Sequence, residues 1–161
     1  MVLLFGLWSM SEKNDAGGVS GVAERACDAP PRPGVNYQDC HHGKVDWPGA
    51  ALRGARLRNA RFDGPDLLGA DLSNADLAYA RLPRANLAYG DLRGTVATGV
   101  DLQGADLSRA SARDADFRYA DLRGAEMAGI DLAGARLAHA IWIDGRRCGP
   151  GSIGGCVTSN E

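Results

Sequence analysis

The sequence predicts an all-β solenoid, a chain wound into stacked coils of short extended segments that meet at corners. Nineteen consecutive pentapeptides run from residue 50 to residue 144 without an insertion. If the middle residue of each pentapeptide is position i, leucine occupies i thirteen times and alanine occupies i−2 fourteen times. A period of five suits neither a helix, with 3.6 residues per turn, nor a continuous strand, whose side chains alternate. A corner after each short segment lets positions i−2 and i point inward every time.

The large residues at position i form the predicted core. They are Leu52, Leu57, Phe62, Leu67, Leu72, Leu77, Leu82, Leu87, Leu92, Leu102, Leu107, Phe117, Leu122, Met127, Leu132, Leu137 and Trp142. Ala97 and Ala112 are the small residues at this position, and large neighbours are expected to fill the space beside them. The same register extends back through Trp47 and Tyr37, which predicts a degenerate first coil at about residues 35–49.

Polar residues and glycine occupy the remaining positions of each pentapeptide. Glycine recurs at position i+2, at Gly54, Gly64, Gly69, Gly94, Gly99, Gly104, Gly124, Gly129 and Gly134. Glycine permits the backbone conformations that a tight corner needs. Successive coils are expected to stack at the strand spacing of about 4.8 Å, so that each coil contacts only its neighbours.

Several pentapeptides carry a family resemblance. The segments ADLSN, ADLAY, ANLAY, ADLSR and ADLRG resemble the consensus A-[DN]-L-x-x of the pentapeptide repeat family. In that family four pentapeptides make one square coil of a right-handed β-helix. The resemblance therefore implies a right-handed parallel quadrilateral β-helix over residues 35–144, with about five and a half coils stacked at the strand spacing.

The four cysteines lie outside the regular repeats, Cys27 and Cys40 before them and Cys148 and Cys156 after them. None has CxxC spacing, so zinc bound by the Cys40–His42 segment and Cys27 is the weaker interpretation. One local disulfide at each end is the simplest one, and it favours an oxidising compartment. Four reduced thiols in a cytosolic protein are the alternative.

The two ends of the chain differ from the repeats. The ending AIWIDGRRCGPGSIGGC, from residue 140, resembles that of some exported bacterial members of the same family. This likeness implies a capping loop at residues 145–161, pinned by a Cys148–Cys156 disulfide, and we expect Cys27 to tether the lead-in to Cys40. Residues 1–34, rich in Gly, Pro and Ser, are expected to be a flexible lead-in or a remnant signal region.

Hydropathy and cysteine content bear on location. No run of the sequence approaches the roughly 18 apolar residues of a membrane span. A periplasmic or secreted location is favoured over a cytoplasmic one.

Composition and motifs argue against several classes of function. The formal net charge is −2, whereas general nucleic-acid or anionic-membrane binders are usually strongly basic. The sequence contains no nucleophile elbow, phosphate-binding glycine loop or HExxH motif. A core of Leu and Ala leaves no cavity for a site. We therefore expect a protein that is not an enzyme, with no catalytic, cofactor-binding or metal-binding residues and no cofactor.

Carboxylates recur at position i−1, and four-fold stacking places residues twenty apart on one face. Asp71 and Asp91 form one such pair, and Asp106 and Glu126 form another. Like charges stacked in this way cost stability. Arginines at position i+1 are expected to compensate for them, namely Arg53, Arg93, Arg113, Arg118 and Arg123.

Any specific function is thus expected on the outer surface. The candidate interaction residues are Tyr79, Arg113, Arg118, Tyr119 and Arg123, because Tyr and Arg are enriched at binding hot spots. The sequence favours a non-catalytic interaction or scaffold protein, monomeric or weakly dimeric, that presents a charged surface to a protein partner.

The family resemblance implies one alternative function, that of a DNA mimic that binds DNA gyrase or a related topoisomerase and protects it from quinolones. Such a mimic should be a long, markedly acidic rod. Residues 45–144 hold 14 acidic residues and 12 arginines, a net charge of −2. This near balance favours the scaffold interpretation.

Overall fold

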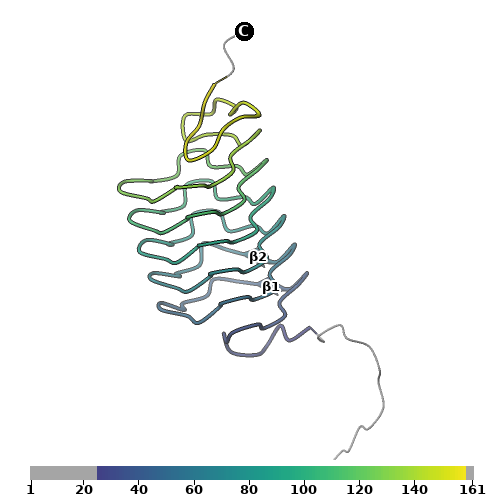
Figure 1. Ribbon diagram of the computed structural model, residues 1–161. Helices are drawn as coiled ribbons and strands as arrows, with labels where there is room; N and C mark the ends of the chain where they lie inside the picture. The colour runs from purple at the N-terminus through teal and green to yellow at the C-terminus, as the bar shows by residue number, and fades with distance from the viewer. Residues whose placement is uncertain (1–24, 159–161) are drawn as a thin grey trace, which may run out of the picture.

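The computed structural model describes residues 25–158, which form a tower of stacked coils (Figure 1). Its two strands are β1, His41–His42, and β2, Arg61–Phe62. They pair in parallel, with His41 opposite Arg61 and His42 opposite Phe62. Elsewhere single parallel bridges join residues twenty apart, from Asn36↔Arg56 to Asp121↔Ile141. Each coil therefore contains four pentapeptides, in agreement with the predicted four sides.

Backbone hydrogen bonds explain how such short segments hold together. The Leu72 N–H donates to the Asp91 carbonyl of the next coil at 2.8 Å, and the Asp91 N–H donates back to the Ala70 carbonyl at 2.9 Å. At the corner that follows, the Ala75 N–H donates to the Leu72 carbonyl at 2.9 Å. Repetition of this pattern along the tower satisfies the buried backbone groups without any long strand.

The core is a column of alanine and leucine side chains. Of the predicted core residues, fourteen are buried: Leu52, Leu57, Phe62, Leu67, Leu72, Leu77, Leu82, Leu87, Leu92, Leu102, Leu107, Phe117, Leu122 and Leu137. Met127, Leu132 and Trp142 differ from the expectation, because they are only partly buried. These three lie near the upper end of the tower, where no further full coil covers them.

The corners adopt the left-handed backbone conformation at position i+2. Glycine supplies it at the nine predicted positions, for example at Gly99, with a φ of 65°. Nine non-glycine corner residues of the tower between 59 and 139 adopt it as well: Asn59, Asn74, Tyr79, Arg84, Tyr89, Arg109, Asp114, Tyr119 and His139. The corner is thus a property of the position, and glycine is the least strained residue there.

Aromatic rings fill the lower end of the tower. The His42 ring stacks on Phe62, with centroids 4.8 Å apart, and meets Tyr37 edge-on at 4.7 Å. The Tyr37 hydroxyl donates to the Ala29 carbonyl at 2.6 Å. Cys27 is bonded to Cys40, which confirms the predicted disulfide. Most of the expected lead-in, residues 1–24, lies outside the described residues.

The upper end is closed by a segment that folds back. Antiparallel bridges join Ile141 to Arg147 and Arg136 to Ile153. The second predicted disulfide, Cys148–Cys156, is also confirmed and pins this segment. Antiparallel pairing at the top covers strand edges that would otherwise remain open.

Candidate interaction surface

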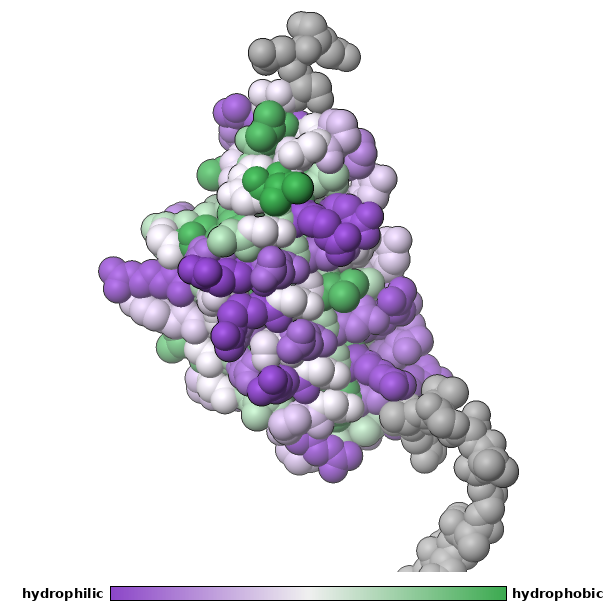
Figure 2. All heavy atoms as spheres, viewed as in Figure 1, coloured by the Kyte–Doolittle hydropathy of each residue, from purple (hydrophilic) through white to green (hydrophobic). Residues whose placement is uncertain are grey.

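The tower has four outward faces, which we name by their lowest residue at position i−1. The Asn36 face carries Asn36, Arg56, Asp76, Val96, Asp116 and Arg136, and the His41 face carries His41, Arg61, Arg81, Asp101, Asp121 and Ile141. The Asp46 face carries Asp46, Asp66, Asn86, Asp106 and Glu126, and the Ala51 face carries Ala51, Asp71, Asp91, Ser111 and Asp131. Figure 2 shows hydrophilic side chains on successive coils of the surface that it presents.

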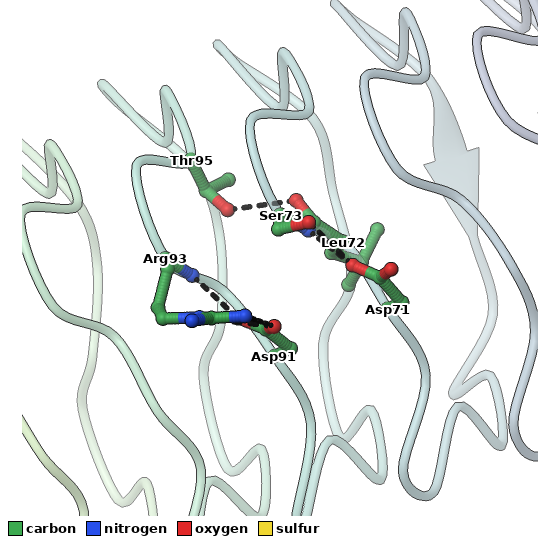
Figure 3. Close-up of polar contacts among 6 residues, drawn as sticks. All are labelled: Asp71, Leu72, Ser73, Asp91, Arg93 and Thr95. Carbon is green, nitrogen blue, oxygen red and sulfur yellow. Dashed lines mark hydrogen bonds and ion pairs between the residues drawn. The ribbon is translucent and has the colours of Figure 1, made fainter.

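The recurring Asp and Asn at position i−1 shape the chain locally. Figure 3 shows Asp71 accepting hydrogen bonds from the Ser73 N–H and hydroxyl, and Asp91 accepting one from the Arg93 N–H at 3.1 Å. Similar side-chain bonds to the N–H two residues later recur at Asp106 and Asp121. These carboxylates and amides fix the segment before the corner. Sequence reasoning missed this structural role, although the frequent occurrence of Asp or Asn at position i−1 was its signal.

A single threonine replaces alanine at an inward position. Thr95 is buried, and its hydroxyl donates to the Leu72 carbonyl at 2.9 Å (Figure 3). The buried hydroxyl is therefore satisfied within the core and is not a nucleophile exposed to substrate.

Arginines neutralise many of the carboxylates on the Ala51 and His41 faces. Arg93 holds Asp91 at 2.5 Å and Arg123 holds Asp121 at 2.6 Å, each two residues after its partner. Hydrogen bonds from these guanidinium groups hold the pKa of Asp91 and of Asp121 below its usual range. The predicted compensation by arginines at position i+1 holds at these places.

Among the carboxylates that form ion pairs, that of Asp116 on the Asn36 face is the most buried. Its side chain is 6 % exposed and lies 2.8 Å from both Arg118 and Arg136. Burial raises the pKa of Asp116, but hydrogen bonds from Arg118 and the charge of Arg136 outweigh burial and hold the pKa below its usual value. This triad ties two neighbouring coils together.

The Asp46 face lacks such compensation. Its four carboxylates, Asp46, Asp66, Asp106 and Glu126, make no ion pair among residues 25–158. Its positions i+1 hold uncharged residues, Pro48, Leu68, Ala88, Ser108 and Ala128. The expectation that arginines at i+1 compensate for stacked carboxylates therefore fails on this face. Asn86 interrupts the column and donates to Asp66 at 2.9 Å.

The five predicted interaction residues do not form one patch. Arg113, Arg118 and Arg123 belong to three successive faces, and each makes an ion pair with an aspartate. Tyr79 and Tyr119 share one corner column two coils apart, and each is 57 % exposed. The structure thus places the arginines in ion pairs within the tower and leaves the tyrosines on its edge.

The hollows on the tower are open to solvent and contain arginine side chains. Two of them, with volumes of about 530 and 330 Å³, share His41, Arg61 and Arg81 as lining residues. A third, of about 410 Å³, is lined by Arg53, Arg93 and Arg113 among others. Within residues 25–158, no group of three His, Cys, Asp or Glu side chains is placed to hold a metal ion. In the same range no helix is long and apolar enough to cross a membrane.

Comparison with known families agrees with this geometry. A profile of the family "Pentapeptide repeats" matches residues 43–78, 75–111 and 113–141, well over half of the chain, in eight copies. The chain belongs to the pentapeptide repeat family. Membership implies a right-handed, four-sided β-helix, and the twenty-residue register agrees with four sides.

Solved structures of other pentapeptide repeat proteins are similar to this one. HetL, involved in heterocyst differentiation regulation in the cyanobacterium Nostoc sp. strain PCC 7120, is 26 % identical, with a TM-score of 0.44, over 71 % of this chain and 70 % of its own. A protein of the Arabidopsis thaliana thylakoid lumen is 22 % identical, with a TM-score of 0.42, over 87 % of this chain and 91 % of its own.

A third similar structure is QnrB1, a plasmid-mediated fluoroquinolone resistance protein. It is 19 % identical, with a TM-score of 0.38, over 66 % of this chain and 58 % of its own. Among curated proteins, no match to the sequence was found.

Proposed function

We propose that this pentapeptide repeat protein is a non-catalytic binding scaffold whose Asp46 face engages a positively charged surface of a partner protein. The observation that carries the proposal is that the carboxylates of this face make no ion pair with any residue from 25 to 158. Every other face carries arginine at position i−1 or i+1, whereas the Asp46 face carries four carboxylates and no cation at those positions.

The electrostatics of the face support this assignment. Asp106 pairs in register with Glu126, and Asp46 with Asp66. Like charges placed opposite each other are destabilising, and cations of a partner would relieve that repulsion. A surface of one sign also accelerates the encounter with a partner of the opposite sign and selects against other partners.

The shape of the face suits a protein partner. Leu68, 41 % exposed, lies two residues after Asp66 and offers an apolar contact among the carboxylates. Coils that are hydrogen-bonded on both sides hold the charges at a fixed spacing, so little conformational entropy is lost on binding. We infer a scaffold of about five and a half coils at the strand spacing, monomeric or weakly dimeric.

The two disulfides support a periplasmic or secreted location for this scaffold, because disulfides persist in oxidising compartments. Mass spectrometry of the denatured protein, alkylated at lysis of the source cells, tests this location by counting the alkylated cysteines. No alkylated cysteine is expected, and four would contradict the location.

Crosslinking in extracts of the source organism tests the binding face. A reagent that joins carboxylates to lysines, followed by mass spectrometry, is expected to give intermolecular links from Asp46, Asp66, Asp106 or Glu126. Asp71 and Asp101, carboxylates of other faces, serve as internal controls. Links confined to the control carboxylates would show that a different face binds.

The carboxylates of the Asp46 face also support one alternative function, that of a DNA mimic that acts on gyrase. Carboxylates repeated along one face resemble the charge pattern of a nucleic-acid backbone. A supercoiling assay with micromolar protein distinguishes the alternatives. Inhibition or quinolone protection that is lost when the four carboxylates are neutralised supports the mimic, and no effect supports the general scaffold.

A further inference from the structure

The His41 face carries two arginines that lie opposite each other on neighbouring coils. On the lower half of the His41 face, Arg61 of β2 pairs in register with Arg81 of the next coil. Within the described range of the chain, this is the one place where two arginines oppose each other at position i−1. Two like charges opposite each other cost stability unless a counter-charge lies near them.

Asp39 and Asp63 line the surface beside these arginines, but neither carboxylate forms an ion pair with them within residues 25–158. Arg61 makes no ion pair with any residue between 25 and 158, and Arg81 makes a single long one, 3.6 Å to Asp101. The Arg81 side chain is 58 % exposed, so its guanidinium group is accessible. By contrast, Arg93 and Arg123 are held by two or more hydrogen bonds to one carboxylate each.

The surface is also hollowed beside Arg61 and Arg81. Hollows of about 530 and 330 Å³ lie on the two sides of the column, and both are lined by His41, Arg61 and Arg81. The larger one is also lined by Asn59 and Tyr79, which can donate hydrogen bonds. Its one carboxylate, Asp39, already accepts a hydrogen bond from Asn59 at 3.0 Å.

We infer that Arg61 and Arg81 form a binding site for a dianionic oxyanion, a phosphate group either free or as a monoester. Guanidinium groups bind the oxygens of phosphate in pairs, through parallel N–H donors. A phosphate group with a charge of about −2 neutralises both arginines at once, which a singly charged carboxylate does not. His41 and Tyr79, which line the larger hollow, provide further donors.

Thermal unfolding of the full chain with inorganic phosphate tests the site, and potassium chloride at equal ionic strength is the reference. The melting temperature is expected to rise saturably with phosphate and to change little with chloride. The double variant Arg61→Gln/Arg81→Gln should lose this response, with a dissociation constant at least about tenfold higher. Arg123→Gln, which removes one charge from the same face, should keep it.

Two further measurements keep the result decisive. Circular dichroism establishes that the double variant is folded, and calorimetric titration with glycerol phosphate and with inorganic phosphate distinguishes a monoester from the free ion. Without ligand the double variant should be at least as stable as the parent, since it lacks the arginine repulsion. A phosphate response equal to that of chloride, or one that survives in the folded double variant, would overturn the inference.

Discussion

Tyr119 lies flat against His139 of the next coil, with ring centroids 5.1 Å apart and ring planes inclined by 22°. Both residues occupy corner position i+2 with a positive φ, 61° and 63°. In this conformation a corner side chain points toward the corner of the coil above it. That corner must therefore offer either empty space or a stacking partner.

Glycine usually provides the space. Five large corner residues are followed twenty positions later by glycine: Asn74 by Gly94, Tyr79 by Gly99, Arg84 by Gly104, Arg109 by Gly129 and Asp114 by Gly134. At two further corners without glycine, the side chains interact directly. Arg109 lies over the Tyr89 ring at 5.6 Å, and Asn59 donates to Asp39.

Two glycine-to-alanine substitutions separate backbone strain from this packing. Gly69 has a φ of 65° with nothing within 4 Å of an added Cβ, so Gly69→Ala should cost about 1 kcal/mol of strain. Gly99 has the same φ, but its Cβ would lie 2.7 Å from the Tyr79 ring. Gly99→Ala should therefore cost more, measured by urea denaturation. Equal losses for the two variants would show that the Tyr79 ring does not depend on the glycine.

The loss of stability caused by a core substitution should depend on the position of the residue along the tower. Leu92 is fully buried between two coils, so Leu92→Ala should lower the free energy of unfolding by about 3 kcal/mol. Leu132 is only partly buried near the upper end, so Leu132→Ala should cost roughly 1 kcal/mol because less apolar surface returns to water. Similar losses in equilibrium denaturation would mean that the upper end is covered.

The Asp at position i−1 can be tested as a structural acceptor. Asp106 accepts a hydrogen bond from the Ser108 N–H at 2.8 Å and belongs to the Asp46 face, whose carboxylates make no ion pair among residues 25–158. Asp106→Asn keeps the acceptor and removes a charge, so stability should stay constant or rise slightly. Asp106→Ala removes the acceptor and should cost about 1 kcal/mol. If Asp106→Asn and Asp106→Ala lower the free energy of unfolding equally, the hydrogen bond from the Ser108 N–H does not account for the contribution of Asp106 to stability.

Acidification should weaken the lower end through His42. Burial among aromatic rings lowers the pKa of His42 below its ordinary 6.5, although the charge of Asp28 opposes the shift and that of His41 adds to it. The unfolded chain therefore binds a proton first, and stability should fall as the pH decreases from about 6.5 toward the lower folded pKa.

Denaturation curves between pH 8 and pH 5 measure this effect. His42→Phe should flatten the dependence in this window, because the ring remains apolar and no longer titrates. His41→Gln, which changes the exposed neighbour, should preserve most of it. A dependence that His42→Phe leaves unchanged would assign the titration to another group.

The sequence predicted the regions of the structure that repeat. The alternation of Ala and Leu indicated which side chains are inside, because a buried column leaves a strict trace at every fifth residue. The local disulfides followed from their position at the ends. The family resemblance supplied the four sides, since a period of five is compatible with other numbers of sides.

The candidate surfaces could not be predicted in the same way. Arg113, Arg118 and Arg123 are close in sequence but lie on three faces, and their charges are used in ion pairs. The Asp46 face is built from residues twenty apart, and the lack of ion pairs on it among residues 25–158 depends on side-chain geometry. The charges had to be grouped by face before it became clear that the Asp46 face has no arginine or lysine at positions i−1 and i+1.

Neutralisation of the Asp46 face tests the central claim most directly. Asp46→Asn, Asp66→Asn, Asp106→Asn and Glu126→Gln are combined in one chain, and the matched control neutralises Asp71, Asp91, Asp101 and Asp121. The affinity of each chain for the crosslinked partner is then measured by titration at low and at physiological salt. The account predicts that the face variant binds at least about tenfold more weakly and loses most of its salt dependence, while the control binds nearly as the parent does. Unchanged binding by the folded face variant, or an equal loss in the control, would contradict it.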